Sequence, residues 1–250
     1  MALIAVSELG IGVAGRDLIH GIDLALAPRQ IIAVLGPNGV GKSTFFRTLL
    51  RLQPARSGSI LLDGAQIAHL SRAEIARKIA FVPQTVEVPF PLTALDFVVM
   101  GRTSYLGVLA APSKADFRKA EDALDNLGIL HLTDRPVTRL SGGERQLVLI
   151  ARALAQGAPT ILLDEPASAL DFANRERLAE VLKDLATQGK GLIFSTHDPG
   201  QAARLASQVL CLFRSGEVRL LPVGEALAPD TLARLYGMTV EAVLQGLAVS

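Results

Sequence analysis

Residues 36–44 read Gly36-Pro37-Asn38-Gly39-Val40-Gly41-Lys42-Ser43-Thr44. An apolar run at 31–35 precedes this stretch and another apolar segment, 45–50, follows it, so the order predicts a strand, a loop and a helix. The three glycines allow the backbone angles and the close approach by which several backbone N–H groups point into one concavity. The alternative reading is a glycine-rich turn that binds nothing.

A polyphosphate is the ligand that such a concavity suits. The helix expected from Lys42 onward adds its positive N-terminal end. Lys42 would reach the β- and γ-phosphates as a point charge, and the Ser43 hydroxyl would complete a Mg²⁺ shell. The spacing G-x-x-x-x-G-K-[ST], placed between a strand and a helix, therefore predicts a P-loop that holds a nucleotide through residues 36–44.

Composition excludes several classes of protein. Half of the 250 residues are hydrophobic, yet no apolar run approaches the length of a membrane span. Lys and Arg number 25 against 24 Asp and Glu, and this balance argues against a nucleic-acid partner. Cys211 is the only cysteine, which rules out an internal disulfide and suits a reducing compartment. Its apolar neighbours predict a buried structural thiol.

Periodicity predicts one α/β domain over residues 1–250. Alternating residues in 1–30 predict a small antiparallel sheet. Apolar strands that alternate with helices predict a parallel sheet covered on both faces. Almost no strand signal occurs from 85 to 157, where helical patterns appear at 93–101, 114–127 and 142–156. We therefore expect a nucleotide-binding core with a β subdomain (1–84 and 158–221), an inserted helical subdomain (85–157) and a short helical appendix (222–250).

Two adjacent carboxylates, Asp164 and Glu165, follow the apolar run at 160–163. Neighbours on a strand point to opposite sides, so the two side chains can take different tasks. In a nucleotide site Asp164 would hold the Mg²⁺ water shell, whereas Glu165 would orient and deprotonate the attacking water. Paired acids at a strand end are a weak signal alone, and the P-loop in the same chain makes them a strong one.

The segment 140–146 reads Leu-Ser-Gly-Gly-Glu-Arg-Gln. Ser141, with Glu144 three residues later, predicts a capping box at a helix start. Gly142 and Gly143 leave the first backbone amides of that helix uncovered, which makes a second anion site. An ordinary capped helix is the alternative interpretation.

These segments resemble, in content and order, the ATP-binding subunit of ABC transporters along nearly the whole chain. The resemblance implies a P-loop NTPase with a RecA-like core. In the family's pattern, residues 36–44 match the Walker A loop, Gln84 the Q-loop, 140–146 the signature motif, 162–165 the Walker B motif, 168–171 the D-loop and His197 the switch histidine.

The resemblance also implies a head-to-tail homodimer, in which each ATP lies between one copy's Walker A loop and the other copy's signature helix. Residues 36–44 together with Ser141, Gly142, Gly143 and Asp171 would bind ATP. Glu165, His197 and Gln84 would be catalytic, and Mg²⁺ would lie at Ser43, Gln84 and Asp164. The other implied partners are membrane permease subunits and, indirectly, a substrate-binding protein, with this chain peripheral on the cytoplasmic side of the membrane.

A narrower likeness covers residues 81–172. The segments 97–102, 105–107, 146–152 and 169–174 look like those of ATPases that serve importers of metal chelates such as iron–siderophores, haem and cobalamin, or of oxyanions such as molybdate. The apolar stretch between Val86 and Val99 lies where that family docks the coupling helix of its membrane partner. The alternatives are the ATPase of an exporter, and an ABC ATPase that acts on ribosomes or DNA. The second is disfavoured because only 56 residues separate Gln84 from Ser141, too few for a long coiled coil.

Three positions depart from the family's pattern. Val13 aligns where an aromatic residue often stacks on adenine, so base stacking is expected to be weaker or supplied elsewhere. Arg29 stands where a glycine usually precedes the Walker A strand, and Ala167 replaces a common threonine. None of the three belongs to the expected phosphate chemistry.

Overall fold

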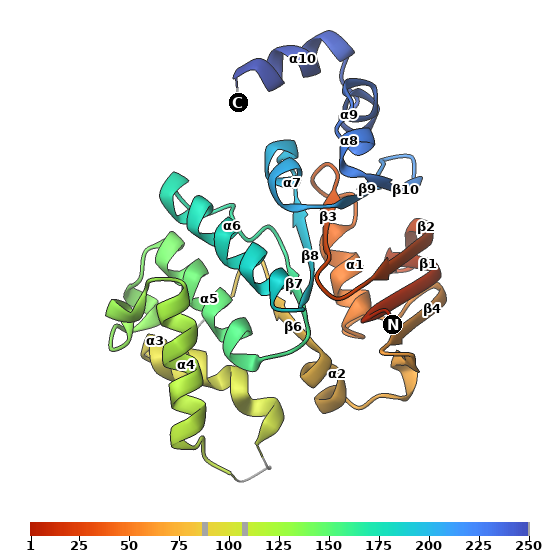
Figure 1. The fold of residues 1–250 in the computed structure, drawn as a ribbon. Helices are drawn as coiled ribbons and strands as arrows, with labels where there is room; N and C mark the ends of the chain where they lie inside the picture. The colour runs from red at the N-terminus through yellow and green to blue at the C-terminus, as the bar shows by residue number, and fades with distance from the viewer. Residues whose placement is uncertain (87–89, 107–109, 250) are drawn as a thin grey trace.

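The structure, a computed structural model, describes residues 1–86, 90–106 and 110–249. Figure 1 shows strands on one side of the molecule and a group of helices on the other. The smaller sheet is antiparallel and has the order β2-β1-β4-β5. Its strands are β1 (Ile4–Val13), β2 (Arg16–Leu26), β4 (Ser57–Leu62) and β5 (Ala65–Gln66). Buried and exposed residues alternate along much of β2, as the sequence pattern in 1–30 predicts.

The larger sheet positions the candidate site. Its order is β10-β9-β3-β8-β7-β6, and all its neighbouring pairs are parallel except β10 with β9. Every residue of β3, β7 and β8 is buried, which explains why these strands consist mainly of apolar residues. Parallel strands bring their carboxyl ends to one edge, so the loops after them meet there. The strands are β3 (Ile31–Leu35), β6 (Ile79–Val82), β7 (Thr160–Leu163), β8 (Gly191–Thr196), β9 (Gln208–Leu212) and β10 (Val218–Pro222).

Helices cover both faces of this sheet. Helix α1 (Lys42–Leu49) buries Phe45, Phe46 and Leu49 in a core that it shares with the antiparallel sheet. On the other face, residues of α6 and α7 join a second core with the helical region and the tail. The α/β fold predicted from the sequence is therefore confirmed. The remaining core helices are α2 (Arg72–Lys78), α6 (Phe172–Thr187) and α7 (Pro199–Leu205), and the tail forms α8 (Val223–Ala226), α9 (Pro229–Tyr236) and α10 (Val240–Val249).

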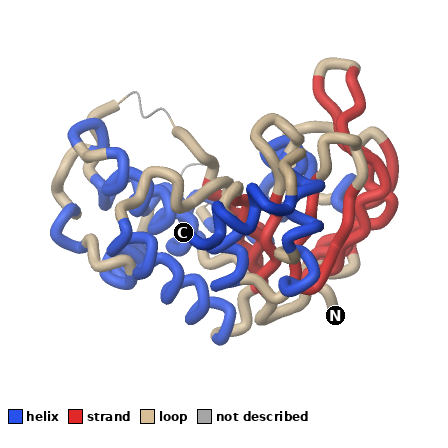
Figure 2. Tube along the Cα trace, turned by 90° about the horizontal axis from the view of Figure 1, so that it is seen from above, coloured by secondary structure: helices blue, strands red, loops and turns tan. Residues whose placement is uncertain are grey.

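The segment between β6 and β7 is helical, and Figure 2 shows it set apart from the strands. It contains α3 (Ala94–Val99), α4 (Lys114–Asn126) and α5 (Gly142–Gln156), and α3 continues as a 3-10 helix over Met100–Tyr105. The apolar stretch Val86 to Val99 includes residues 87–89, and the likeness at 105–107 includes Gly107. These four residues lie outside the described part of the chain. Among the described residues, no helix is both long and apolar enough to cross a membrane.

A buried ion pair fixes the helical region. Arg102 Nε donates to Asp116 Oδ1 at 3.0 Å, and its Nη1 donates to the carbonyls of Ala155 and Gln156 at the end of α5. Asp116 also forms a capping box with Ser113 at the start of α4. Arg102 therefore holds α4 and α5 together at the end of α5 that is remote from Ser141. The hydrogen bonds from Ser113, with the neighbouring Arg102, lower the pKa of Asp116 to about 2.

The turn before β3 explains why glycine is common in the family's pattern at the position of Arg29. Arg29 has φ of +67°, a left-handed conformation that glycine adopts without strain. The turn is closed by a 3.3 Å hydrogen bond from Gln30 N to Ala27 O, and Arg29 N donates to Lys190 O. The Arg29 side chain is exposed, so no packing of this side chain offsets the strain of its backbone conformation.

We predict that Asp116→Asn destabilises the fold at pH 7 and that the difference from the wild type narrows at low pH. The pKa of Asp116 is lower in the folded chain than its ordinary value of 3.8. Its charge therefore stabilises the fold above about pH 4, and this contribution is lost as the pH falls towards 2. Urea midpoints at pH 7 and pH 3 test this, with Asp122→Asn on the exposed face of α4 as the control. An equal difference at both pH values would contradict it.

We predict that Arg29→Gly raises the free energy of unfolding by about 0.5 to 1 kcal/mol. Relief of a left-handed residue contributes about 1–2 kcal/mol, and the greater chain entropy of glycine removes part of that gain. Urea unfolding measures the change. Arg29→Ala is the matched control, because it removes the same side chain and keeps the strained φ. A gain of the same size in both variants would show that φ is not the cause.

Candidate functional site

The structure favours glycine at all three of its positions in residues 36–44, and Gly39 has φ of +79°. A Cβ at Gly36 would lie 2.7 Å from the Leu212 carbonyl oxygen, and Gly41 has φ of +122°. Helix α1 starts directly after Gly41, which caps it without a side-chain hydrogen bond, and its first turn has no acidic residue. By contrast, Ser141 caps α5 through its hydroxyl. The first N–H groups of α1 are therefore left for an external anion.

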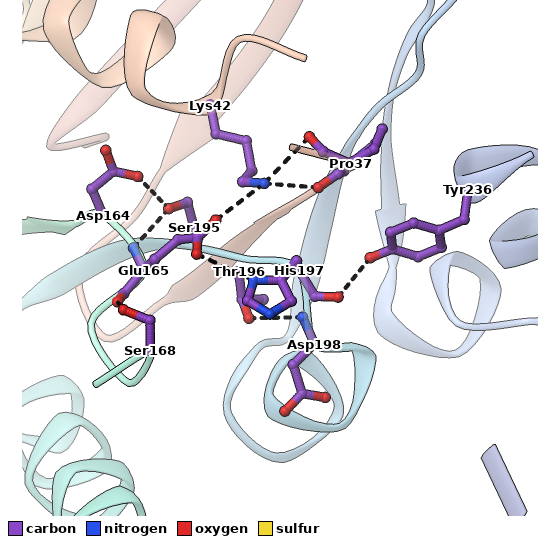
Figure 3. A network of polar contacts seen from close by, with 11 residues as sticks. Pro37, Lys42, Asp164, Glu165, Ser168, Ser195, Thr196, His197, Asp198 and Tyr236 are labelled. Carbon is purple, nitrogen blue, oxygen red and sulfur yellow. Dashed lines mark hydrogen bonds and ion pairs between the residues drawn. The ribbon is translucent and has the colours of Figure 1, made fainter. Parts of the chain in front are cut away.

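Lys42 is buried, with 6% of its side chain exposed. Its Nζ donates to the carbonyl of Gly36 at 2.8 Å and to that of Pro37 at 3.4 Å, and it lies 3.3 Å from Glu165 Oε1. Figure 3 shows the ammonium between the loop carbonyls and the carboxylate. The cation of the loop is thus directed at the place where β3 and β7 end.

Asp164 and Glu165 do not continue the strand, because β7 ends at Leu163. Strand alternation, on which the sequence argument relied, is therefore not what separates their side chains. Glu165 has φ of +47°, and its N–H donates to Ser195 Oγ at 2.9 Å. The same hydroxyl donates to Asp164 Oδ1 at 2.6 Å. Ser195, on β8, thus ties down Asp164, while the left-handed turn directs the Glu165 side chain towards Lys42 and His197.

His197 follows β8 and approaches Glu165 from the other side. Its Nδ1 lies 3.1 Å from Glu165 Oε2, and 55% of the side chain is exposed. Lys42 and His197 therefore face different oxygens of one carboxylate, which is itself only 11% exposed. Tyr236, from α9, donates its hydroxyl to the His197 carbonyl at 2.9 Å. A cavity of about 370 Å³ reaches Glu165 and His197 from between α6 and α7.

A smaller hollow lies beside residues 38–40. It measures about 270 Å³ and is lined by Asn38, Gly39 and Val40 together with Arg16, Asp17, Leu18, Phe213 and Arg214. Val13, the position aligned with a base-stacking aromatic residue, is 46% exposed at the end of β1 and does not line this hollow. Arg16 and Leu18, which the sequence reasoning missed, stand beside the loop instead.

The signature segment is presented at the surface. Ser141 and Glu144 form the predicted capping box, and Arg135 pairs with Glu144 at 2.9 Å. A Cβ at Gly142 would meet nothing within 4 Å, so the helix start is open there. In the described part of the chain, no hydrogen bond or ion pair joins residues 141–143 to residues 36–44. Asp171, expected at the nucleotide, caps α6 in this chain by accepting from Asn174 N at 2.8 Å.

The residues expected at Mg²⁺ offer oxygen donors, the type that this ion prefers. Ser43 lies in the first turn of α1, and Asp164 follows β7, with its N–H donating to the Val82 carbonyl on β6 at 2.8 Å. Gln84 follows β6 by two residues and is exposed. Among the described residues, no group of three or more His, Cys, Asp or Glu could hold a metal. A few protein oxygens completed by phosphates and water fit Mg²⁺ better than a cage of carboxylates.

The sequence reasoning did not identify Ser195 and Tyr236 as residues of the site, and only Ser195 carries a signal in the sequence. Ser195 is a polar residue at the end of an apolar strand that leads to His197, and it is fully buried. Such a buried hydroxyl needs a partner, which was a usable signal. Tyr236 lies 39 residues after His197 and carries no local signal of its contact.

Comparison with known proteins identifies the family. The sequence profile of the ABC transporter family matches residues 19–168, which include the P-loop, the signature segment and the Asp164–Glu165 pair. A molybdate import ATP-binding protein of Haemophilus influenzae is 40% identical over 86% of this chain and 81% of its own length. An iron(3+)-hydroxamate import ATP-binding protein of Bacillus subtilis is 33% identical over 97% of this chain and 91% of its own.

A solved structure extends the likeness to three dimensions. A metal-chelate type ABC transporter in an inward-facing conformation superposes with a TM-score of 0.83 and 36% identity. The match covers 94% of this chain and 89% of that one. Sequence and fold therefore agree over nearly the whole chain. The protein belongs to the ABC transporter family, as an ATP-binding cassette ATPase.

Proposed function

We propose that this chain is the ATP-hydrolysing subunit of an importer and powers uptake of a metal chelate through a separate membrane permease. The observation that carries the enzymatic part is the Glu165 carboxylate, which has Lys42 at one oxygen and His197 at the other. A shielded carboxylate beside a cavity has the placement of a general base for an attacking water. Relatives of nearly equal length support the importer part.

The roles follow from the geometry. The uncapped start of α1 and the backbone of residues 36–44 would bind the triphosphate, and Lys42 would move its donors from the loop carbonyls to the phosphate oxygens. Glu165 would then accept the proton of the attacking water, with His197 directed at the γ-phosphate. Ser43, Gln84 and Asp164 would hold Mg²⁺, which neutralises charge on the phosphates when bound.

The second half of the nucleotide site would come from another copy of the chain. The open start of α5 at Ser141, Gly142 and Gly143 has no bond to the P-loop of its own chain in the described residues. Two chains placed head to tail would bring that helix start to the partner's phosphates and would enclose two ATP molecules. Asp171, at the start of α6, would lie at the same interface.

The transport role rests on the likeness and on one exposed aromatic side chain. Phe90 is 68% exposed and lies six residues after Gln84, in the stretch where the resemblance to the family places the docking of the membrane partner. The chain would bind permease subunits there, peripherally on the cytoplasmic side of the membrane, and a substrate-binding protein would deliver the cargo. Iron–siderophores, haem, cobalamin and similar chelates are the proposed cargo class. An exporter ATPase is the second candidate, and an ABC ATPase that acts on ribosomes or DNA is the third.

We predict that Glu165→Gln lowers kcat for ATP hydrolysis about 10²- to 10⁴-fold and traps an ATP-bound dimer, because the amide cannot accept the proton of water. Steady-state hydrolysis and gel filtration with MgATP measure the two effects. Lys42→Ala is the control, since it should lose ATP binding and remain monomeric. Hydrolysis by Glu165→Gln at the wild-type rate would refute the role of this residue.

We predict that tagged Glu165→Gln protein, purified with MgATP from detergent-solubilised native membranes, carries a multi-span permease with it. The trapped ATP state should hold the complex together during purification. Mass spectrometry identifies the companion, and the binding protein associated with that permease leads to the cargo. Recovery with ribosomes or nucleic acid, and without a membrane protein, would overturn the transport role. Lack of a binding protein would favour the exporter.

A further inference from the structure

Helix α9, in the tail of the chain, is anchored firmly beside the site. Leu232 and Leu235 are each 1% exposed, in the core that also contains β9. The Arg234 guanidinium lies 5.1 Å from the centroid of the Phe213 ring and pairs with Glu217. These contacts attach α9 to the turn between β9 and β10, so its last residue has a fixed position.

That last residue is Tyr236, which contacts the main chain of His197. Its hydroxyl donates to the His197 carbonyl at 2.9 Å, and Figure 3 shows the phenol directed at this group from the tail. The ring is half-buried and packs against the same core. Burial raises the pKa of the Tyr236 hydroxyl, which therefore stays protonated and able to donate at neutral pH.

His197 lies in a link of two residues between β8 and α7. One end of the link is tied by the Asp198 N–H, which donates to Thr196 Oγ1 at 3.0 Å. Asp198 in turn caps α7 through the Gly200 N–H at 2.8 Å. In the described part of the chain, the donor to the His197 carbonyl is the Tyr236 hydroxyl. The peptide that carries the imidazole is thus oriented by a residue from the tail.

We propose that Tyr236 is a positioning residue of the nucleotide site, which fixes the main chain of His197 and so makes the C-terminal appendix part of the hydrolytic machinery. This inference rests on the proposed function of His197. The imidazole is more than half exposed, so its approach to Glu165 depends on the backbone that carries it. Loss of the phenol hydroxyl frees the carbonyl to turn towards water, and the ring nitrogen moves with it.

The test is Tyr236→Phe in the full 250-residue chain, because phenylalanine keeps the ring packing and removes only the hydrogen-bond donor. We expect kcat for ATP hydrolysis to fall two- to tenfold, the range that one net hydrogen bond spans. KM for ATP should change less than twofold and the melting temperature should stay the same. Tyr105→Phe is the matched control, since Tyr105 is the only other tyrosine and stacks on Arg102 in the helical region. An unchanged kcat in Tyr236→Phe overturns the proposal.

A double-mutant cycle separates positioning from a general structural effect. In a His197→Ala background, followed by single-turnover hydrolysis with enzyme in excess, Tyr236→Phe should leave the residual rate unchanged. The same fold loss in both backgrounds would show that Tyr236 does not act through His197. Failure of the proposed function is distinguishable, because it would appear as wild-type hydrolysis no faster than that of Lys42→Ala.

Discussion

The candidate site depends on the pair of hydrogen bonds made by Ser195. This buried hydroxyl donates to Asp164 and accepts from the Glu165 N–H, so β8 holds both residues after β7 ends. A non-glycine residue in the left-handed region costs about 1–3 kcal/mol, and it persists only where its surroundings determine it. The Ser168 hydroxyl, which donates to the Glu165 carbonyl at 2.9 Å, supports the same turn. Two neighbouring carboxylates thereby acquire different environments from one serine.

The same molecule uses helix starts in two ways. In helix α5 the capping box satisfies the N–H groups of Ser141 and Glu144 and leaves those of Gly142 and Gly143 between them open, whereas the start of α1 has no side-chain cap at all. An uncapped helix start is destabilising unless an anion or water occupies it. The uncapped start of α1 lies beside the buried Lys42, so an anion bound there would contact both the ammonium group and several backbone N–H groups. The stability that α1 lacks by itself is available from its ligand.

The fold and most of the site could be predicted because their signals are local. Apolar runs predict β3, β7 and β8. Because these strands are parallel, the residues that follow each of them lie close together at the carboxyl ends of the strands. The orientation of Glu165 was predicted for the wrong reason, because strand alternation ends one residue too early. The contact from Tyr236 could not be predicted at all, since 39 residues and a β-hairpin separate it from His197.

A hydrogen bond to a main-chain carbonyl differs in consequence from one to a catalytic side chain. Tyr236 fixes the His197 peptide without occupying either ring nitrogen, so the imidazole keeps both nitrogens for Glu165, for phosphate or for solvent. The backbone is held while the side chain, 55% exposed, remains able to rotate. A residue that must change partners during a reaction cycle needs this division between a fixed Cα and a free ring. Tyr236, from the tail, holds the His197 main chain, and the solvent-exposed position after the carboxyl end of β8 leaves the imidazole room to rotate.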